Sequence, residues 1–202
     1  MKSLEIEIYT CDEKSIAKVI TGWISSLKSS RELFNQMKQI GINCCKLKSF
    51  SINSSNMNSD ECYEYVMQTI NNNFTQIKRL RISGNLYGKA KEEDDNHNMI
   101  NETLRSHLLD KCKRLTHFTF TVKWYLNDSF FDNIGQHLPK LQYLSFENYD
   151  TSDEVLNELS KLTHLRAIKV GTDDRGFDNE QEYLGKHCPK FVDAYYKYFC
   201  TD

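Results

Sequence analysis

Six histidines and seven cysteines are the side chains of this sequence best suited to metal binding or nucleophilic catalysis. His107, Cys112 and His117 follow one another at equal spacing, and such a set could bind zinc. The apolar pattern around them predicts an inward-facing Cys112 and an outward-facing His117, so the three side chains would not converge. The other candidates have no Asp or Glu motif beside them to complete a catalytic triad, namely His164, His187 and Cys188. We therefore predict no metal, no cofactor and no enzymatic activity.

The elements that must position these side chains follow from an apolar repeat, φ-xx-φ-xx-φ-x-φ, in which φ is an apolar residue. Its copies begin at Cys44, Phe74, Cys112, Leu138 and Leu162, with a weaker copy at Cys188 and a truncated one at Met1. In the last four copies the third sites lie about 25 residues apart, a period within the range of leucine-rich repeats; they are Phe118, Leu144, Ile168 and Ala194. Each copy ends in an alternation with a period of two, which predicts a strand.

The segments between the copies carry helix signals. Thr151 and Glu154 are spaced as a capping box before an amphipathic run. Asn127 can cap a single helix with one apolar face, formed by Phe131, Ile134 and Leu138. One strand and one helix cannot bury their apolar sides alone, so successive copies must stack. We predict an α/β leucine-rich-repeat solenoid, a single domain over residues 1–202, with a curved parallel sheet on the concave face and helices on the convex face.

The repeat resembles the cysteine-containing leucine-rich repeats of F-box and leucine-rich-repeat proteins over residues 42–198. The likeness is plainest in residues 112–120 and in the proline-bearing copies at 138–141 and 188–191. In that family the repeats hold the substrate of a cullin-type ubiquitin ligase, while a separate helical F-box, which we do not see here, recruits the ligase core. The resemblance implies partner or substrate recognition in such a pathway. The alternative is a solenoid that binds or inhibits another protein without ubiquitin.

The same repeat accounts for most of the cysteines. Cys44, Cys112 and Cys188 occupy its first apolar site and Cys62 lies on a predicted helix face, where buried thiols are expected. An odd number of cysteines without a secretory signal also argues against disulfides. We therefore expect structural cysteines and a cytoplasmic or nuclear protein.

Two parts of the chain depart from the repeat. Residues 1–41 contain a predicted strand and two predicted helices, over 13–28 and 31–40, and they form either a cap or irregular first repeats. The segment 13–28 carries the strongest helical apolar stripe of the chain. Residues 85–98 contain an acidic run without apolar periodicity, which predicts a loop insertion. This loop is either solvated or clasps a basic partner.

The strand residues that flank the third and fourth apolar sites should point out of the sheet on the side without helices. We predict that this concave face binds a partner through Arg79, Arg81, His117, Thr119, Tyr143, Glu147 and Lys169. Arg and Tyr often anchor protein interfaces, which favours this interpretation. A solvated sheet face that binds nothing is the alternative.

Charge and hydropathy favour a protein as the partner. A net charge of −2 does not provide the broad basic field of a nucleic-acid-binding domain. A local basic stripe is nevertheless present, formed by Lys78, Arg79, Arg81, Lys111, Lys113 and Arg114. No run approaches the roughly 18 apolar residues of a membrane span. The sequence does not indicate an oligomeric state.

Overall fold

A computed structural model gives the fold of the chain. It describes residues 3–9, 22–25, 48–54, 70, 76–84, 105–109, 111–122, 128–146, 152–170 and 178–192. Only the backbone is described for residues 3–9, 22–25, 52–54, 84, 107–108, 122, 170 and 178–180. The predicted helix 31–40 and the predicted loop 85–98 lie outside these residues, as do Cys44, Cys62 and Glu147.

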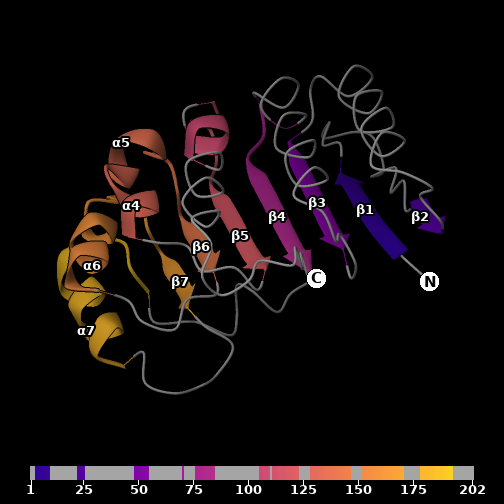
Figure 1. The fold of residues 1–202 in the computed structure, drawn as a ribbon. Helices are drawn as coiled ribbons and strands as arrows, with labels where there is room; N and C mark the ends of the chain where they lie inside the picture. The colour runs from indigo at the N-terminus through magenta and orange to yellow at the C-terminus, as the bar shows by residue number, and fades with distance from the viewer. Residues whose placement is uncertain are drawn as a thin grey trace.

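In the described part of the chain, seven strands form one sheet in the order β2-β1-β3-β4-β5-β6-β7. Five neighbouring strands are parallel, namely β3 (Ser49–Ser54), β4 (Arg79–Gly84), β5 (His117–Val122), β6 (Tyr143–Phe146) and β7 (Ala167–Val170). The parallel sheet and its accompanying helices confirm the predicted α/β class (Figure 1).

The register of the parallel strands joins equivalent sites of the apolar repeat. The third sites pair in one row, Phe50, Leu80, Phe118, Leu144 and Ile168. The fourth sites pair in a second row, Ile52, Ile82, Phe120, Phe146 and Val170. A slip of one residue would turn either row to the opposite face of the sheet, so burial of the apolar rows specifies this register.

A turn of constant geometry precedes the later strands. The N–H of the second apolar site donates to the carbonyl of the first, at 2.9 Å from Leu115 to Cys112 and at 3.0 Å from Leu141 to Leu138. The next two copies make the same bond, from Leu165 to Leu162 at 2.9 Å and from Phe191 to Cys188 at 3.0 Å. The constant spacing of the first two apolar sites in these copies therefore corresponds to a repeated hydrogen-bonded turn.

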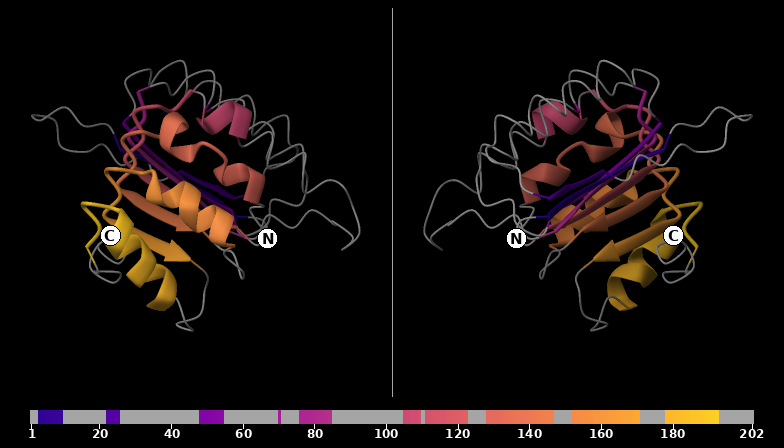
Figure 2. Two further views of the ribbon diagram at one scale, coloured as in Figure 1. Left: turned by 90° about the vertical axis from the view of Figure 1, so that its left-hand side faces the viewer. Right: turned by 90° about the vertical axis from the view of Figure 1, so that its right-hand side faces the viewer.

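The helical segments delimited within the described residues are η1, one turn of π-helix (Arg105–Leu109), α4 (Asp128–Phe131), α5 (Ile134–His137), α6 (Asp153–Ser160) and α7 (Asp178–His187). Figure 2 shows α6 and α7 beside the last strands of the sheet. Buried apolar residues of these helical segments belong to one hydrophobic cluster with the third sites of the five parallel strands and with the fourth sites Ile82, Phe120 and Phe146. In α4, for example, the Phe131 ring lies 4.9 Å from that of Phe146.

Two helix boundaries differ from the sequence prediction. Ser152, not Thr151, caps α6, because its hydroxyl accepts the N–H of Val155 at 3.2 Å. The single helix predicted after Asn127 is wrong, because Asn133 interrupts it in the left-handed conformation at φ 56°. The Asn133 N–H donates to Glu158 Oε2 at 3.0 Å, which offsets the hydrogen bond lost to the interruption.

The first strands also differ from expectation. β1 (Ser3–Tyr9) is antiparallel to β3, whereas a further repeat would run parallel. This pairing sets Ile6 opposite Ile52 and Ile8 opposite Phe50, and so keeps the apolar alternation in phase with β3. The predicted helix over 13–28 is wrong at its end, because residues 22–25 form β2 (Gly22–Ser25), an edge strand antiparallel to β1. Trp23 and Ile24 have high strand propensity, and pairing with β1 overrides the helical stripe.

Candidate binding face

Two rows of side chains on the sheet contain most of the residues predicted to bind a partner. In the first row, Arg79 pairs with His117 and His117 with Tyr143. In the second row, Arg81 pairs with Thr119, Thr119 with Ser145, and Ser145 with Lys169. These residues alternate with the apolar sites, so they project from the opposite side of the sheet to the core. The strands therefore bring together the six described candidates, Arg79, Arg81, His117, Thr119, Tyr143 and Lys169, which we call the outer face.

His117 lies at the centre of the outer face, between Arg79 and Tyr143. Its ring stacks on that of Tyr143, with centroids 4.3 Å apart and an interplanar angle of 26°. The Thr116 hydroxyl donates to the Lys78 carbonyl at 3.0 Å and lies 2.9 Å from His117 Nδ1. A hydroxyl has one hydrogen to donate, so the Nδ1–H of His117 must donate to Thr116. This tautomer leaves Nε2 as a hydrogen-bond acceptor.

The environment of His117 favours the neutral imidazole. Burial, and secondarily the positive charge of Arg79, lower the pKa of His117 from 6.5 to about 4. At neutral pH the charge on this row therefore comes from Arg79, and the imidazole contributes a polar, uncharged acceptor.

Part of the outer face is buried. Tyr143 is 7% exposed, and Ser145 and Ala167 are each 2% exposed. These three residues alternate along β6 and β7 with Leu144, Phe146 and Ile168 of the hydrophobic cluster, so they face away from it. The stack with His117 covers one face of the Tyr143 ring. Tyr143 is therefore a mostly buried member of the outer face, whereas the exposed cations of the face, Arg79 and Arg81, lie on β4.

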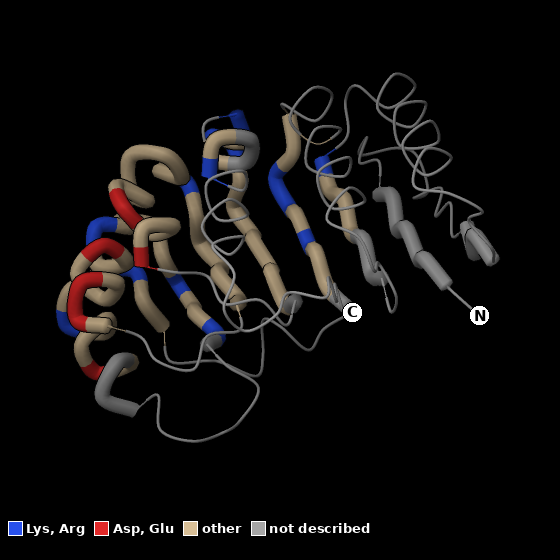
Figure 3. The backbone as a smooth tube through the Cα atoms, viewed as in Figure 1, with Lys and Arg blue, Asp and Glu red and all other residues tan. Residues whose placement is uncertain are grey.

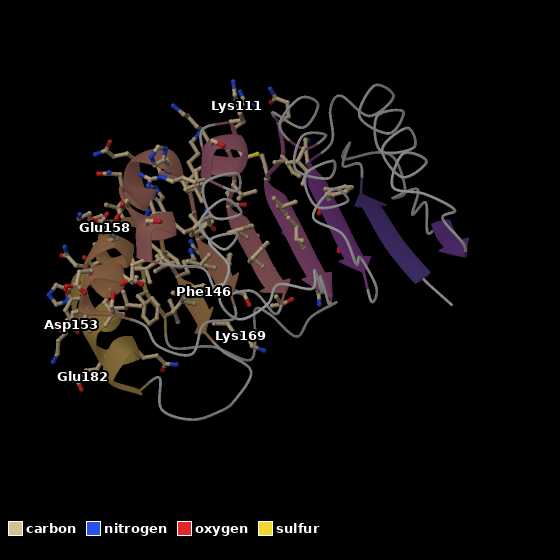
Figure 4. The ribbon with its side chains drawn as sticks, in the orientation of Figure 1. Lys111, Phe146, Asp153, Glu158, Lys169 and Glu182 are labelled. Atoms are coloured by element: carbon tan, nitrogen blue, oxygen red, sulfur yellow. The ribbon has the colours of Figure 1, made fainter. Side chains whose placement is uncertain are left out.

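Charge is distributed unevenly between the sheet and the helices. Figure 3 shows Lys and Arg on the strands and at their starts, and Asp and Glu around the helices. All described acidic side chains lie on α4, α6 or α7 or in the α4–α5 connection, namely Asp128, Asp132, Asp153, Glu154, Glu158 and Glu182. In Figure 4, Lys111 lies next to η1, far from Asp153 and Glu182. Among the side chains that the structure describes, the charged residues of the strands and of the turns before them are therefore all Lys or Arg.

Several cations of this arrangement were not recognised in the sequence analysis. Lys140, Arg166 and Lys190 occupy the turns before β6 and β7 and after α7, and all three are exposed. They align with Lys78, Lys113 and Arg114, which the sequence analysis had grouped as a local stripe. Each lies within or directly after the turn that links the first two apolar sites of its copy, and this recurrence is the signal that would have identified them.

The two described cysteines are packed in the core. Cys112 is fully buried and Cys188 is 2% exposed, as the repeat predicted. Burial raises the pKa of Cys112 to about 12 and that of Cys188 to about 11, so both are thiols at neutral pH. Cys112 faces inward while His117 projects outward, so these two side chains diverge as predicted. Among the residues that the structure describes, no three His, Cys, Asp or Glu side chains gather as a metal site.

Comparison of the sequence with known protein families and with curated proteins found no match to either. Within the described ranges, no helix is long and apolar enough to cross a membrane. The function is therefore argued from the repeat and the outer face.

Proposed function

We propose that this chain is a protein-binding module, a leucine-rich-repeat solenoid that holds its partner on the outer face. The observation that carries the proposal is the repeated turn, strand and register, which presents equivalent side chains of successive strands in two rows. Repeat proteins of this kind use such extended surfaces for binding. The exposed Arg79 and Arg81 are the candidate anchors, because Arg is enriched where protein interfaces carry most of their binding energy.

A chemical role finds less support in the described residues. The buried thiols of Cys112 and Cys188 have raised pKa values, which disfavour the thiolate that a nucleophile requires. His117 is held by Thr116 and Tyr143, and no carboxylate among the described residues orients its ring. A binding role requires neither a thiolate nor an oriented catalytic histidine, and it is compatible with the neutral, stacked His117 of the outer face.

The resemblance to F-box and leucine-rich-repeat proteins favours a partner that is a ubiquitylation substrate. The second candidate function is a ubiquitin-independent solenoid that binds or inhibits its partner. Affinity purification of the tagged protein from cells distinguishes the two. Recovery of the adaptor subunit of a cullin-type ligase supports the first, and a partner recovered without the adaptor supports the second.

A charge reversal tests the outer face itself. Arg81→Glu should remove the partner from the purification, while Lys186→Glu should retain it. The control has the same change in net charge and loses only an exposed ion pair with Glu182 on α7, at 2.6 Å. Thermal unfolding of both variants shows whether they fold. If folded Arg81→Glu recovers as much of the partner as the wild-type protein does, the partner does not bind through this face.

A further inference from the structure

The cations at the starts of the strands form a line across the sheet. We define the strand-start edge as the exposed residues Lys78, Lys113, Arg114, Lys140, Arg166 and Lys190. They belong to equivalent turns of successive repeats, and the residues before the strands are linked through the backbone. The Lys78 carbonyl accepts from Thr116 N at 2.8 Å, the Gln142 carbonyl from Arg166 N at 2.8 Å, and the Arg166 carbonyl from Val192 N at 2.7 Å.

This alignment brings like charges close together. Each of five successive copies contributes at least one cation, placed either between its first two apolar sites (Lys113, Arg114, Lys140 and Lys190) or directly after the second (Lys78 and Arg166). Neighbouring strands are about 4.8 Å apart, so cations of adjacent copies are separated by a distance comparable with the screening length of about 8 Å at physiological salt. Lys78, Lys113, Lys140, Arg166 and Lys190 form no ion pair with any acidic side chain that the structure describes. Arg114 donates to the neutral Gln76 amide oxygen. The edge therefore retains its positive charge within the described fold.

The helix dipole does not account for the whole line. A cation is favourable near a helix C-terminus, but the effect is confined to the last turn. Arg166 lies beyond the end of α6 at Ser160 and immediately before β7, and Lys78 lies immediately before β4. A binding partner with negative charge explains the cations at both the turns and the strand starts.

We propose that the strand-start edge binds an acidic, extended segment of a partner protein, rich in Asp and Glu. This inference rests on the proposed function and names the chemistry of the partner. Successive carboxylates of an extended chain can each approach a cation of the line. Single-stranded nucleic acid fits less well, because it requires exposed aromatic rings for base stacking. The described aromatic residue of the neighbouring outer face, Tyr143, is 7% exposed and stacked on His117.

Fluorescence anisotropy tests the proposal with a labelled ten-residue peptide of alternating Glu and Ser. The control peptide has Gln in place of Glu, and hexathymidylate carries the same number of charges on a nucleic acid. We expect the Glu peptide alone to bind, and its affinity to fall about tenfold in Lys140→Gln/Lys190→Gln. Lys186→Glu changes the net charge equally on α7, and it should leave the affinity within about twofold.

Three results would overturn the proposal. They are equal binding of the Gln peptide, equal weakening by Lys186→Glu, or tighter binding of hexathymidylate than of the Glu peptide. Thermal unfolding verifies that the double variant is folded, and Lys140→Gln alone, with a smaller expected loss, replaces it if it is not. If no acidic peptide binds while Arg81-dependent capture of the partner persists, this inference fails and the proposed function stands.

Discussion

The imidazole of His117 stacks on the ring of Tyr143, with centroids 4.3 Å apart, on the side of the sheet that faces away from the core. His117 and Tyr143 are directly paired residues of β5 and β6, so the contact depends on the parallel register. Such a cross-strand pair stabilises the sheet where no apolar cluster does. The outer face therefore combines a rigid aromatic centre with the exposed cations of β4.

Replacement of His117 should change how stability depends on pH. The folded-state pKa of about 4 lies below the ordinary value of 6.5, so between these values the unfolded chain binds the proton more strongly. The contribution of the neutral His117 imidazole to the free energy of unfolding is therefore complete above pH 6.5 and is lost as the pH falls towards 4. Thermal unfolding should show a smaller loss of stability over this interval for His117→Gln than for the wild type. If stability falls equally with pH in the two proteins, the pKa of His117 is not lowered by folding.

Charge at the third apolar site should unfold the protein. Leu144 is fully buried between Phe118 and Ile168 in the register, and Leu144→Asp would bury a carboxylate without a partner. We expect a loss of several kcal/mol in the free energy of unfolding, measured by urea denaturation. Thr119→Asp places the same charge on the outer face and should remain folded. Comparable unfolding of the two variants would mean that the faces are assigned incorrectly.

The parallel part of the sheet could be predicted from the sequence because burial and spacing agree there. Phe118, Leu144 and Ile168 occur at the same site of successive copies, and the strands align them as predicted. The period of two then determines which side chains share the outer face. Local pattern and tertiary pairing thus specify the same register.

The remaining features depend on interactions that a local pattern does not contain. The antiparallel direction of β1 and the strand at Trp23 follow from pairing between distant segments. The break at Asn133 depends on Glu158, in the following helix. Alternation along β6 predicts the direction of Ser145 but not that it is only 2% exposed.

Cys112 and Cys188 should resist alkylation in the folded protein. Their burial hinders access of the reagent, and their raised pKa values leave few thiolates at pH 8. Mass spectrometry of peptides after iodoacetamide treatment should show both unmodified in buffer and both modified in urea. Rapid modification in buffer would contradict their placement in the core.

Two helical glycines should respond in opposite ways to replacement by alanine. Gly185 lies in α7, and an added methyl group would meet no atom within 4 Å. Gly185→Ala should therefore stabilise the protein by about 0.5 to 1 kcal/mol, because alanine has the higher helix propensity. At Gly135 in α5, the methyl group would lie 3.1 Å from both Cβ and the carbonyl oxygen of Lys161. The backbone after α6 would have to shift, and this crowding should cancel or exceed the gain in propensity. Urea denaturation of the two variants measures the difference, and equal stabilisation by both would show that α5 does not pack closely against the end of α6.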